Sequence, residues 1–435
     1  MPTDTAMPAG QDQPTSTAPA QGSDMRRLRA GPGQFAPMSR QSSFLPLKMK
    51  VVDEAGQAQE WDSWRIRFTG QGGEYFKLWM VNLLLTVATL GLYYPWARLR
   101  KLRYLANATQ LDGHSLQFHG KPWPLLRGYL LLGALAFAVN VAVQISRPAA
   151  LVAIGTMVLL TPALWRTALR FRLANTSWRG VRFQFTGSWA GAYLPFLVVS
   201  GPAWAFAAVL ATASRHAPAH DNFETLLIQT GLGSFMGICI ALTVLLVPAG
   251  MFLLKRYQHS HYRFGQWQTQ YKGTLASFYK PFGMLLIGAC ALFILFFLRD
   301  VLARSSSTGL VLSSTLIALV SVLAMLVYYI SVVPYLKVAQ FKAAWGPTLT
   351  PDQRVNCNLQ VLSFVLLTLK NNLLTGITMG LYWPVAQMNF LQAKVESLRI
   401  ASRVPLSEAV AQMQAQDIES SGEAAVDLFG IDFGL

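Results

Sequence analysis

Residues 309–336 read GLVLSSTLIALVSVLAMLVYYISVVPYL, a run without one charged side chain. A helix that crosses a bilayer needs about 20 predominantly apolar residues, so this run predicts a transmembrane helix. Similar apolar segments occur at five other places in the chain, namely Leu126–Ser146, Ala149–Trp165, Ala190–Ser214, Leu226–Leu254 and Pro281–Leu298. The sequence therefore indicates a helical membrane protein with at least six spanning segments.

The composition agrees with lipid as the solvent of this chain. Of its 435 residues, 53% are hydrophobic and 13% are charged, whereas soluble proteins carry about 25% charged residues. Residues 75–395 contain 26 Lys and Arg but only five Asp and Glu. A strongly basic chain can bind nucleic acid. Here, however, the cations lie in short loops beside apolar segments, which indicates the cytoplasmic loops of a membrane protein. We expect no nucleic-acid partner.

Two further apolar segments are weaker. Leu78–Leu92 is short and is followed by Pro95, and Val361–Tyr382 is interrupted by a polar triplet at residues 370–372. Basic residues lie on both sides of each segment, which contradicts the positive-inside rule for a spanning helix. Either the tails are external or these segments are short re-entrant elements, and the charge favours the second alternative. The predicted fold is an all-α polytopic membrane bundle with six to eight transmembrane segments and short cytoplasmic β-strands between helix extensions.

Parts of the sequence are repeated. Residues 82–97, NLLLTVATLGLYYPWA, reappear without a gap at residues 371–386 as NNLLTGITMGLYWPVA. A second repeat starts at Pro95, Pro162 and Pro248. An Arg lies eight residues after each of these prolines, and an aromatic-x-Gly motif begins 23 residues after it.

Each copy of the second repeat predicts a helix that extends past the bilayer, then a turn and a short alternating strand. The turns are expected at Asp112-Gly113, Arg179-Gly180 and Phe264-Gly265. Lone strands are not stable in water, so we expect these strands to pair with one another, or with Leu47–Val52, as a small cytoplasmic sheet. The predicted strands are Arg65–Phe68, His114–Phe118, Val181–Phe185 and Gln266–Tyr271.

The motifs also carry a family resemblance. Residues 68–76 (FTGQGGEYF), residues 82–98, Arg103-Tyr104 and the terminal residues 429–435 (FGIDFGL) resemble the YjgN family of bacterial inner-membrane proteins, over roughly residues 60–435. The second copy departs from the pattern, with Val385-Ala386-Gln387 in place of Trp-Ala-Arg. That family is a domain of unknown function, so the resemblance implies a location and a fold but no reaction. We divide the chain into a disordered N-terminal tail (1–45), a YjgN-like membrane domain with internal repeats (60–402) and a C-terminal cytoplasmic tail (403–435).

Polar side chains in the two repeated segments are the first candidate functional residues. Unpaired polar groups are costly in lipid, so a polar residue inside the membrane suggests a function. If the two copies face each other, these side chains line a path near the middle of the membrane. The alternative is that they hold the helices together by hydrogen bonds. The set consists of Asn82, Thr86, Thr89, Lys370, Asn371, Asn372, Thr375 and Thr378.

Cations in the basic loops form the second candidate set. A cation beside an anionic leaflet contributes about 1 kcal/mol to lipid association, so these residues are candidate contacts for anionic head groups. The alternative is that they only fix the topology. The set consists of Arg98, Arg100, Lys101, Arg103, Arg170 and Arg256. The expected partner is the bilayer, in particular its anionic lipids, and the sequence leaves open whether the chain forms a homo-oligomer.

The sequence contains no motif that indicates catalysis, a metal or a cofactor. The histidines, expected in loops or strands, lack the spacing of a metal site, and there is no P-loop. No acidic residue lies inside an apolar segment, which argues against an ion-coupled pump. Three classes of function remain: a passive transporter or channel for a small or amphipathic solute, a scaffold whose basic cytoplasmic face binds anionic lipid or a protein partner, and, with least support, an enzyme with dispersed site residues.

Overall fold

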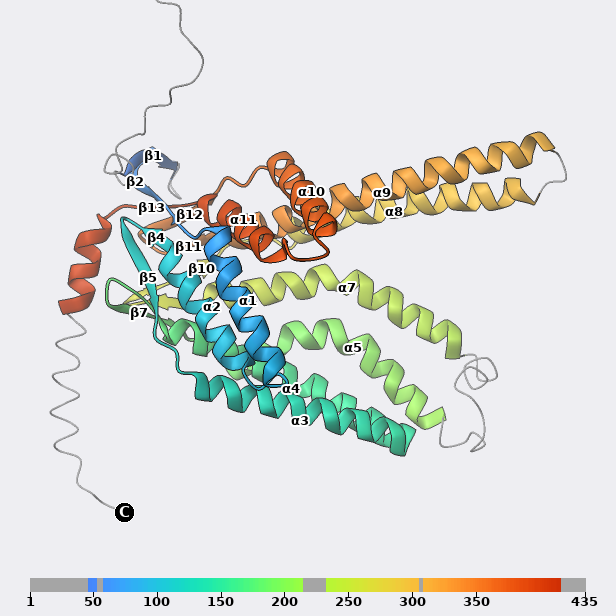
Figure 1. Cartoon of the computed structure of the whole chain (residues 1–435), viewed down its shortest axis with the longest axis horizontal. Helices are drawn as coiled ribbons and strands as arrows, with labels where there is room; N and C mark the ends of the chain where they lie inside the picture. The colour runs from blue at the N-terminus through green and yellow to red at the C-terminus, as the bar shows by residue number, and fades with distance from the viewer. Residues whose placement is uncertain (1–45, 53–57, 214–231, 305–307, 416–435) are drawn as a thin grey trace, which may run out of the picture. The chain divides into compact units, whose positions relative to one another are not determined.

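The computed structural model describes residues 46–52, 58–213, 232–304 and 308–415, so the predicted tail at residues 1–45 lies outside the described residues. The main units of the described chain are five helical hairpins (Figure 1). They are α1 (Gly72–Ala88) with α2 (Tyr94–Ala108), α3 (Pro122–Ile145) with α4 (Arg147–Ala174), α5 (Trp189–Ala213) with α7 (Leu232–Ser260), α8 (Ala276–Ala303) with α9 (Thr308–Trp345), and α10 (Val361–Ile377) with α11 (Trp383–Glu396).

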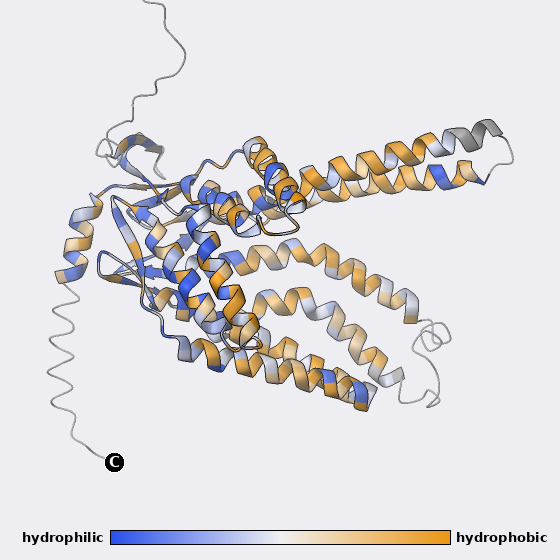
Figure 2. Cartoon of the chain, in the orientation of Figure 1, coloured by the Kyte–Doolittle hydropathy of each residue, from blue (hydrophilic) through white to orange (hydrophobic). Residues whose placement is uncertain are grey.

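The three middle hairpins contain six helices long and apolar enough to cross a membrane. These candidate spans are Pro122–Ile145, Pro148–Ala174, Trp189–Leu210, Leu232–Ser260, Ala276–Ala303 and Ser313–Trp345. They correspond to the six segments predicted from hydropathy, which confirms that prediction, although residues 226–231 lie outside the described part. Hydrophobic residues dominate these helices, and hydrophilic residues gather where the helices join the strands (Figure 2).

The two weaker segments form short hairpins instead of long spans. After α1 the chain turns at residues 89–93, and α2 packs back against α1. The Tyr104 hydroxyl near the end of α2 accepts a hydrogen bond from the Gln71 amide, just before α1, at 3.0 Å. In the other hairpin the rings of Phe364 on α10 and Phe390 on α11 lie 5.6 Å apart. The strand residues before and after each hairpin pair with one another, Phe68 with Thr109 and Cys357 with Leu398.

The sequence repeat produces the same turn in both short hairpins. Leu90 and Met379 have φ angles of 51° and 48°, and the glycines after them, Gly91 and Gly380, have φ angles of 91° and 93°. Each glycine amide donates to the carbonyl five residues earlier at 2.7 Å. This is the Schellman closure of a helix end, in which a left-handed residue lets the last turn satisfy its own carbonyls. The two repeated segments are therefore structural equivalents.

The short strands pair in a ladder that returns to its starting strand. They are β1 (Leu47–Val52), β2 (Ala58–Arg65), β3 (Arg67–Phe68), β4 (Thr109–Leu111), β5 (His114–Phe118), β6 (Thr176–Trp178), β7 (Val181–Phe185), β8 (Tyr262–Phe264), β9 (Trp267–Gln268), β10 (Gln270–Tyr271), β11 (Thr348–Leu349), β12 (Gln353–Cys357) and β13 (Leu398–Ser402). One sheet has the order β1-β2-β13-β12-β11-β10, and the other runs from β3 to β9 in sequence order. Only Ile66 separates β2 from β3, and only Thr269 separates β9 from β10. The pairings therefore close a ring of strands, which confirms that the predicted strands pair with one another and that Leu47–Val52 joins them.

Each of the three tight turns between paired strands contains a glycine, namely Gly113, Gly180 or Gly265. Asp112-Gly113 and Arg179-Gly180 form two-residue turns where predicted, with φ positive at both residues of each turn. Positive φ at both central residues is the geometry that matches the twist of a tight hairpin. The third turn falls on Gly265-Gln266, one residue later than predicted, because Phe264 pairs with Trp267.

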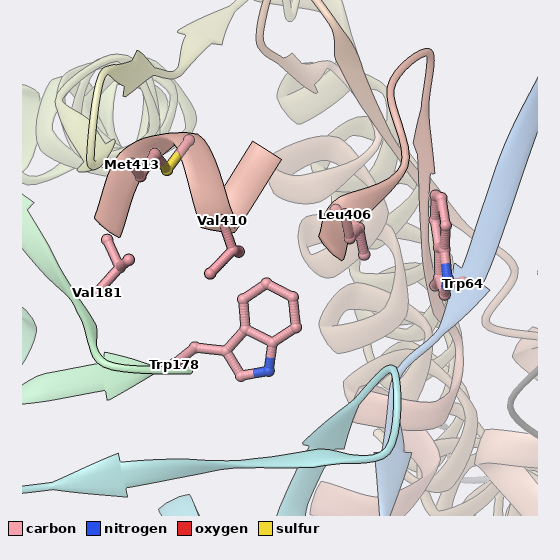
Figure 3. Packing of buried hydrophobic residues seen from close by; sticks show 6 residues of the cluster. All are labelled: Trp64, Trp178, Val181, Leu406, Val410 and Met413. Atoms are coloured by element: carbon pink, nitrogen blue, oxygen red, sulfur yellow. The ribbon is translucent and has the colours of Figure 1, made fainter. Parts of the chain in front are cut away.

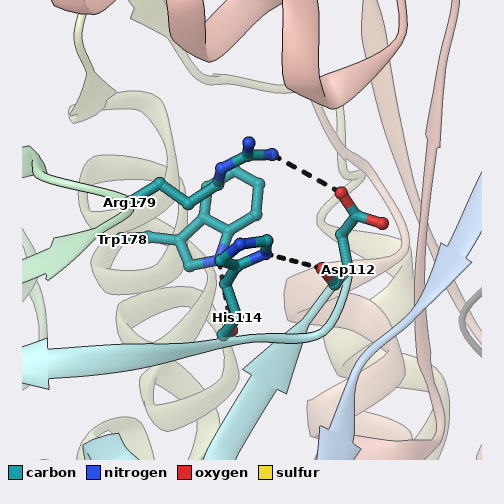
Figure 4. Close-up of polar contacts among 4 residues, drawn as sticks. All are labelled: Asp112, His114, Trp178 and Arg179. Carbon is teal, nitrogen blue, oxygen red and sulfur yellow. Dashed lines mark hydrogen bonds and ion pairs between the residues drawn. The ribbon is translucent and has the colours of Figure 1, made fainter.

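Side chains tie two neighbouring strand hairpins together (Figure 4). Asp112 Oδ2 in the β4–β5 turn lies 3.6 Å from Arg179 Nη1 in the β6–β7 turn, and both side chains are partly buried. Trp178 Nε1 donates a hydrogen bond to the carbonyl of His114 at 3.3 Å. These contacts fix the register of the two hairpins in the ring.

The aromatic-x-Gly motif has a packing explanation. Its aromatic side chains, Phe68, Phe118, Phe185 and Tyr271, are all buried. Each ring folds over the glycine two residues later, so that a Cβ on Gly120, for example, would lie 2.5 Å from the Phe118 ring. Only glycine leaves room for the ring at that position. The motif thus marks the junction between a strand and the helix that follows it.

The five hairpins share one plan. Ten helices of the described chain form a closed cycle of packing contacts in chain order, from α1 to α11 and back to α1. The second helix of each hairpin is followed by a strand. Each of these helices also contacts one strand of the ring: α2 contacts β5, α4 contacts β7, α7 contacts β10, α9 contacts β12 and α11 contacts β13. Each of these second helices also contains a buried proline, at Pro95, Pro162, Pro248, Pro334 and Pro384. The proline repeat therefore extends to five copies, two more than the sequence spacing indicated.

A last helix, over residues 406–415, covers one end of the strand ring. Its Leu406, Val410 and Met413 are 1–2% exposed and pack against Trp64, Trp178 and Val181 of the strands (Figure 3). Met413 also contacts the turn at Gly265. The sequence assigned these residues to a cytoplasmic tail, but they form part of the folded core.

Candidate functional site

Six cations extend from the second helices of the hairpins, beyond the buried prolines. We call them the cation cluster: Arg98 and Lys101 on α2, Arg172 on α4, Lys255 on α7, Lys337 on α9 and Lys394 on α11. All but Lys101 stand three, seven or ten residues after the proline of their helix. An α-helix turns by about 100° per residue, so these positions fall within about 60° of one another on one helix face.

Electrostatic repulsion links the cation cluster into one chain. Arg98 repels Lys101 and Arg172, Arg172 repels Lys255, Lys255 repels Lys394, and Lys394 repels Lys337. In the cycle of helix contacts, α7 and α11 are not neighbours, because α8, α9 and α10 lie between them. Lys255 on α7 and Lys394 on α11 nevertheless lie close enough to repel each other. The Arg172 side chain is exposed.

The cation cluster has no ion pair with a carboxylate among the described residues. Polar contacts hold two of its lysines: Lys255 Nζ donates to Gln258 Oε1 at 3.1 Å, and Lys101 Nζ donates to Gln387 Oε1 at 3.0 Å. A partly buried charge without a counter-charge is costly. An anion from solution would remove part of that cost.

Burial and like charge change the acidity of the two cluster lysines on the short hairpins. Burial, and then repulsion from Arg98, lowers the pKa of Lys101. Burial, and then repulsion from Lys337, lowers the pKa of Lys394. Both lysines therefore give up their protons more readily than a lysine in water does, mainly because they are partly buried and secondly because another cation lies nearby.

The predicted polar residues are distributed over several environments. Asn371 is fully buried and accepts a hydrogen bond from Asn389 Nδ2 at 3.0 Å, while its own Nδ2 has no partner among the described residues. Its repeat equivalent Asn82 is also buried, with Oδ1 unpartnered in the same part of the chain. Lys370 and Asn372 are exposed. The structure therefore does not gather these residues into one site.

The predicted threonines bond to their own helices. Thr86 and Thr375 donate to the carbonyls of Asn82 and Asn371 at 2.6 and 2.7 Å. Thr89 and Thr378 donate to carbonyls four residues earlier and accept from the amides of the turn at 3.0 Å. These hydroxyls stabilise the repeated turn, which is a sufficient reason for their presence at equivalent positions.

Of the predicted head-group cations, Arg98 and Lys101 belong to the cation cluster. Arg103 donates to the carbonyl of Gly120 at 3.1 Å and so holds the strand–helix junction. Arg100 lies over the Tyr93 ring, 5.7 Å from its centre. Arg170 and Arg256 are exposed. They stand eight residues after their prolines, about 100° or more around the helix from the cluster positions.

Sequence reasoning did not single out Arg172, Lys255, Lys337 and Lys394 as site residues. The most regular spacing in the sequence was the arginine eight residues after each proline, and of these arginines Arg103 supports a strand–helix junction. The useful signal was weaker, since the cluster cations stand at three different distances from proline. Positions three, seven and ten residues after a proline lie on the same face of a helix. This becomes clear only when each position is counted from the proline and converted to an angle with the helical period.

One histidine differs from its expected place. His259 lies in α7 and is 1% exposed, whereas loops or strands were expected. Its Nδ1 is 3.0 Å from Thr348 Oγ1, and its ring meets the Trp345 ring edge-on at 4.8 Å. The described residues contain no group of three or more His, Cys, Asp and Glu side chains placed to hold a metal ion.

Comparison with known proteins places this architecture in a family. A family model described as "Bacterial protein of unknown function (DUF898)" matches residues 63–428. The chain is 29% identical over 178 residues to "Inner membrane protein YjgN" of Escherichia coli O157:H7 and of Escherichia coli strain K12, which covers 39% of this chain and 43% of each relative. It is 29% identical over 119 residues to the protein of the same name from Salmonella typhimurium, which covers 27% of this chain and 30% of that relative.

The aligned region spans less than half the length of these curated relatives. No solved structure matches the chain. The names of the relatives and the six long apolar helices identify a multi-pass protein of the bacterial inner membrane, in agreement with the family resemblance seen in the sequence.

Proposed function

Because the chain belongs to the DUF898 family of bacterial proteins of unknown function, we propose from its geometry that it provides a passive path for anionic solutes across the inner membrane. The path runs inside the cycle of helices. It passes the cation cluster on the side of the strand ring.

One observation supports this proposal: cations from five different hairpins lie close enough to repel one another, and none of them forms an ion pair with a carboxylate among the described residues. A protein that needed these charges only to fix its topology would gain nothing by turning them toward each other. Rings of Lys and Arg are the means by which pores select anions. The chain carries no recognised motif for an energy source, so the proposed movement is passive.

A scaffolding role has a separate observation in its favour. Arg170 and Arg256 are exposed at equivalent positions on α4 and α7, where they can contact anionic head groups. This alternative predicts lipid association that depends on Arg170 and Arg256. It predicts no dependence of any flux on the cation cluster.

The reversal potential of the purified chain tests the proposal. The full chain is reconstituted in liposomes of uncharged lipid, and current is recorded across a KCl gradient. We expect a conductance absent from protein-free membranes, with a reversal potential close to the chloride equilibrium potential, because the cation cluster repels potassium. A potassium-selective current, or none at all, would overturn the proposal.

A further inference from the structure

A partly open chamber lies inside the ring of strands. It has a volume of about 320 Å³, within the range of about 300–1,000 Å³ found for ligand pockets. Strands β4 to β9 and β11 to β13 contribute to its wall, and so does Leu406 of the last helix. The wall residues are mainly apolar and include Leu116, Trp178, Phe183, Phe264, Val355 and Ile400.

Such a chamber is unusual for a folded protein. Protein interiors are close-packed, and voids larger than a water molecule are few. An apolar space of this size gains nothing from water, since water needs polar partners, whereas apolar molecules enter such spaces readily. The chamber is therefore suited to an aliphatic chain.

One polar atom in the wall is unsatisfied. Thr350 is 7% exposed and lines the chamber, and its Oγ1 has no hydrogen-bond partner among the described residues. A buried hydroxyl without a partner costs free energy. A ligand with an oxygen near this atom would remove that cost.

The chamber and the cation cluster are connected. Tyr262 lines the chamber, and its hydroxyl accepts a hydrogen bond from Gln258 Nε2. The other amide atom of Gln258 accepts from Lys255 Nζ at 3.1 Å. Arg172 of the cluster also interacts electrostatically with Tyr262. The positive charges of Lys255 and Arg172 therefore lie next to the apolar chamber, where Tyr262 forms part of its wall.

We propose that the chamber and the cation cluster together bind an amphiphile with one aliphatic chain and an anionic head group. The chain occupies the chamber, and the head group lies at Arg172 and Lys255. The binding of the anionic head group rests on the proposed function, in which the cation cluster attracts anions. The binding of the aliphatic chain is inferred from the chamber alone.

Photolabelling tests the inference with the full chain in liposomes of uncharged lipid. The probe is a twelve-carbon alkyl phosphate that carries a diazirine at the end of its chain. We expect labelled residues in β5, β7 and β12, and competition by dodecyl phosphate at concentrations at least tenfold lower than by dodecanol. Inorganic phosphate, which has no chain, is expected not to compete.

Two filling variants locate the site. Val355→Trp and Leu116→Trp place an indole in the chamber and are each expected to reduce the chamber label at least tenfold. Leu47→Trp is the matched control, because Leu47 is 61% exposed on β1 and does not line the chamber. The inference is overturned if the filling variants and the control label equally, or if all label lies in the candidate spans.

The same data separate this inference from the proposed path. Chamber labelling with a preference for the phosphate, in a chain that conducts no anion, would refute the path and keep the chamber as a binding site. An anion-selective current with no label in the chamber would support the path and refute the chamber as a binding site.

Discussion

The double variant Arg172→Gln, Lys255→Gln is expected to conduct chloride at least tenfold less than the unaltered chain. A unit charge about 8 Å from an anion contributes about 2 kcal/mol at an effective dielectric constant near 20. A change of about 1.4 kcal/mol is a factor of ten in an equilibrium constant. Losing two such charges therefore gives at least a tenfold loss after screening by salt. Single-channel conductance and reversal potential measure the effect.

The matched control for this variant is Arg170→Gln, Arg256→Gln. It removes the same net charge from the same two helices, at exposed positions outside the cation cluster. We expect its chloride conductance to stay within twofold of the unaltered chain. Equal losses in the two double variants would mean that general surface charge attracts the anion. A loss of anionic-lipid association in the control alone would favour the scaffolding role.

The substitution Val410→Asp is expected to detach the helix over residues 406–415 from the strand ring. Val410 is 1% exposed and packs among apolar side chains of the strands. An unpaired carboxylate in such a place costs about 3 kcal/mol, which is roughly a hundredfold in the docking equilibrium. Amide hydrogen exchange in the peptide that contains residues 406–415 should accelerate by at least tenfold.

Ala411→Asp is the control for the detachment. It introduces the same charge into the same helix at an exposed neighbouring position. Because alanine is a better helix former than valine, the loss of intrinsic helix propensity is at least as large as in the first variant. Exchange in this control should match the unaltered chain. If Val410→Asp also exchanges at the unaltered rate, the packing of this helix on the ring is not what holds it.

Most of the membrane architecture is predictable from the sequence because lipid imposes a simple length rule. A spanning helix must hide all its backbone groups over about 20 apolar residues, and each of the six clear segments satisfies that rule. The strand hairpins were also visible, because glycine marks both their turns and their junctions. Asp112-Gly113 and Gly120 show this well: one needs positive φ, and the other lies under the Phe118 ring.

What the sequence did not reveal depends on contacts between distant parts. The closure of the strand ring requires β13 to pair with β2, more than 330 residues earlier in the chain, and no local pattern records that pairing. The last helix is difficult to predict from the sequence because it is short and few of its residues are large and apolar. Its Leu406, Val410 and Met413 are recognisable as core residues only once the ring that they cover exists. The cation cluster likewise arises from five helices whose charges are ordinary when each helix is considered alone.

Thiol modification at the cation cluster tests the central claim most directly. Arg172→Cys and Arg170→Cys are prepared in a background in which the free cysteines Cys239, Cys290 and Cys357 are replaced by alanine. Each variant reacts with an anionic and a cationic thiosulfonate reagent of similar size. If the cations gather around an aqueous interior, the ratio of anionic to cationic reaction rates should be at least tenfold higher at Arg172→Cys than at Arg170→Cys. Equal ratios at the two positions, or no reaction at Arg172→Cys, would contradict the account.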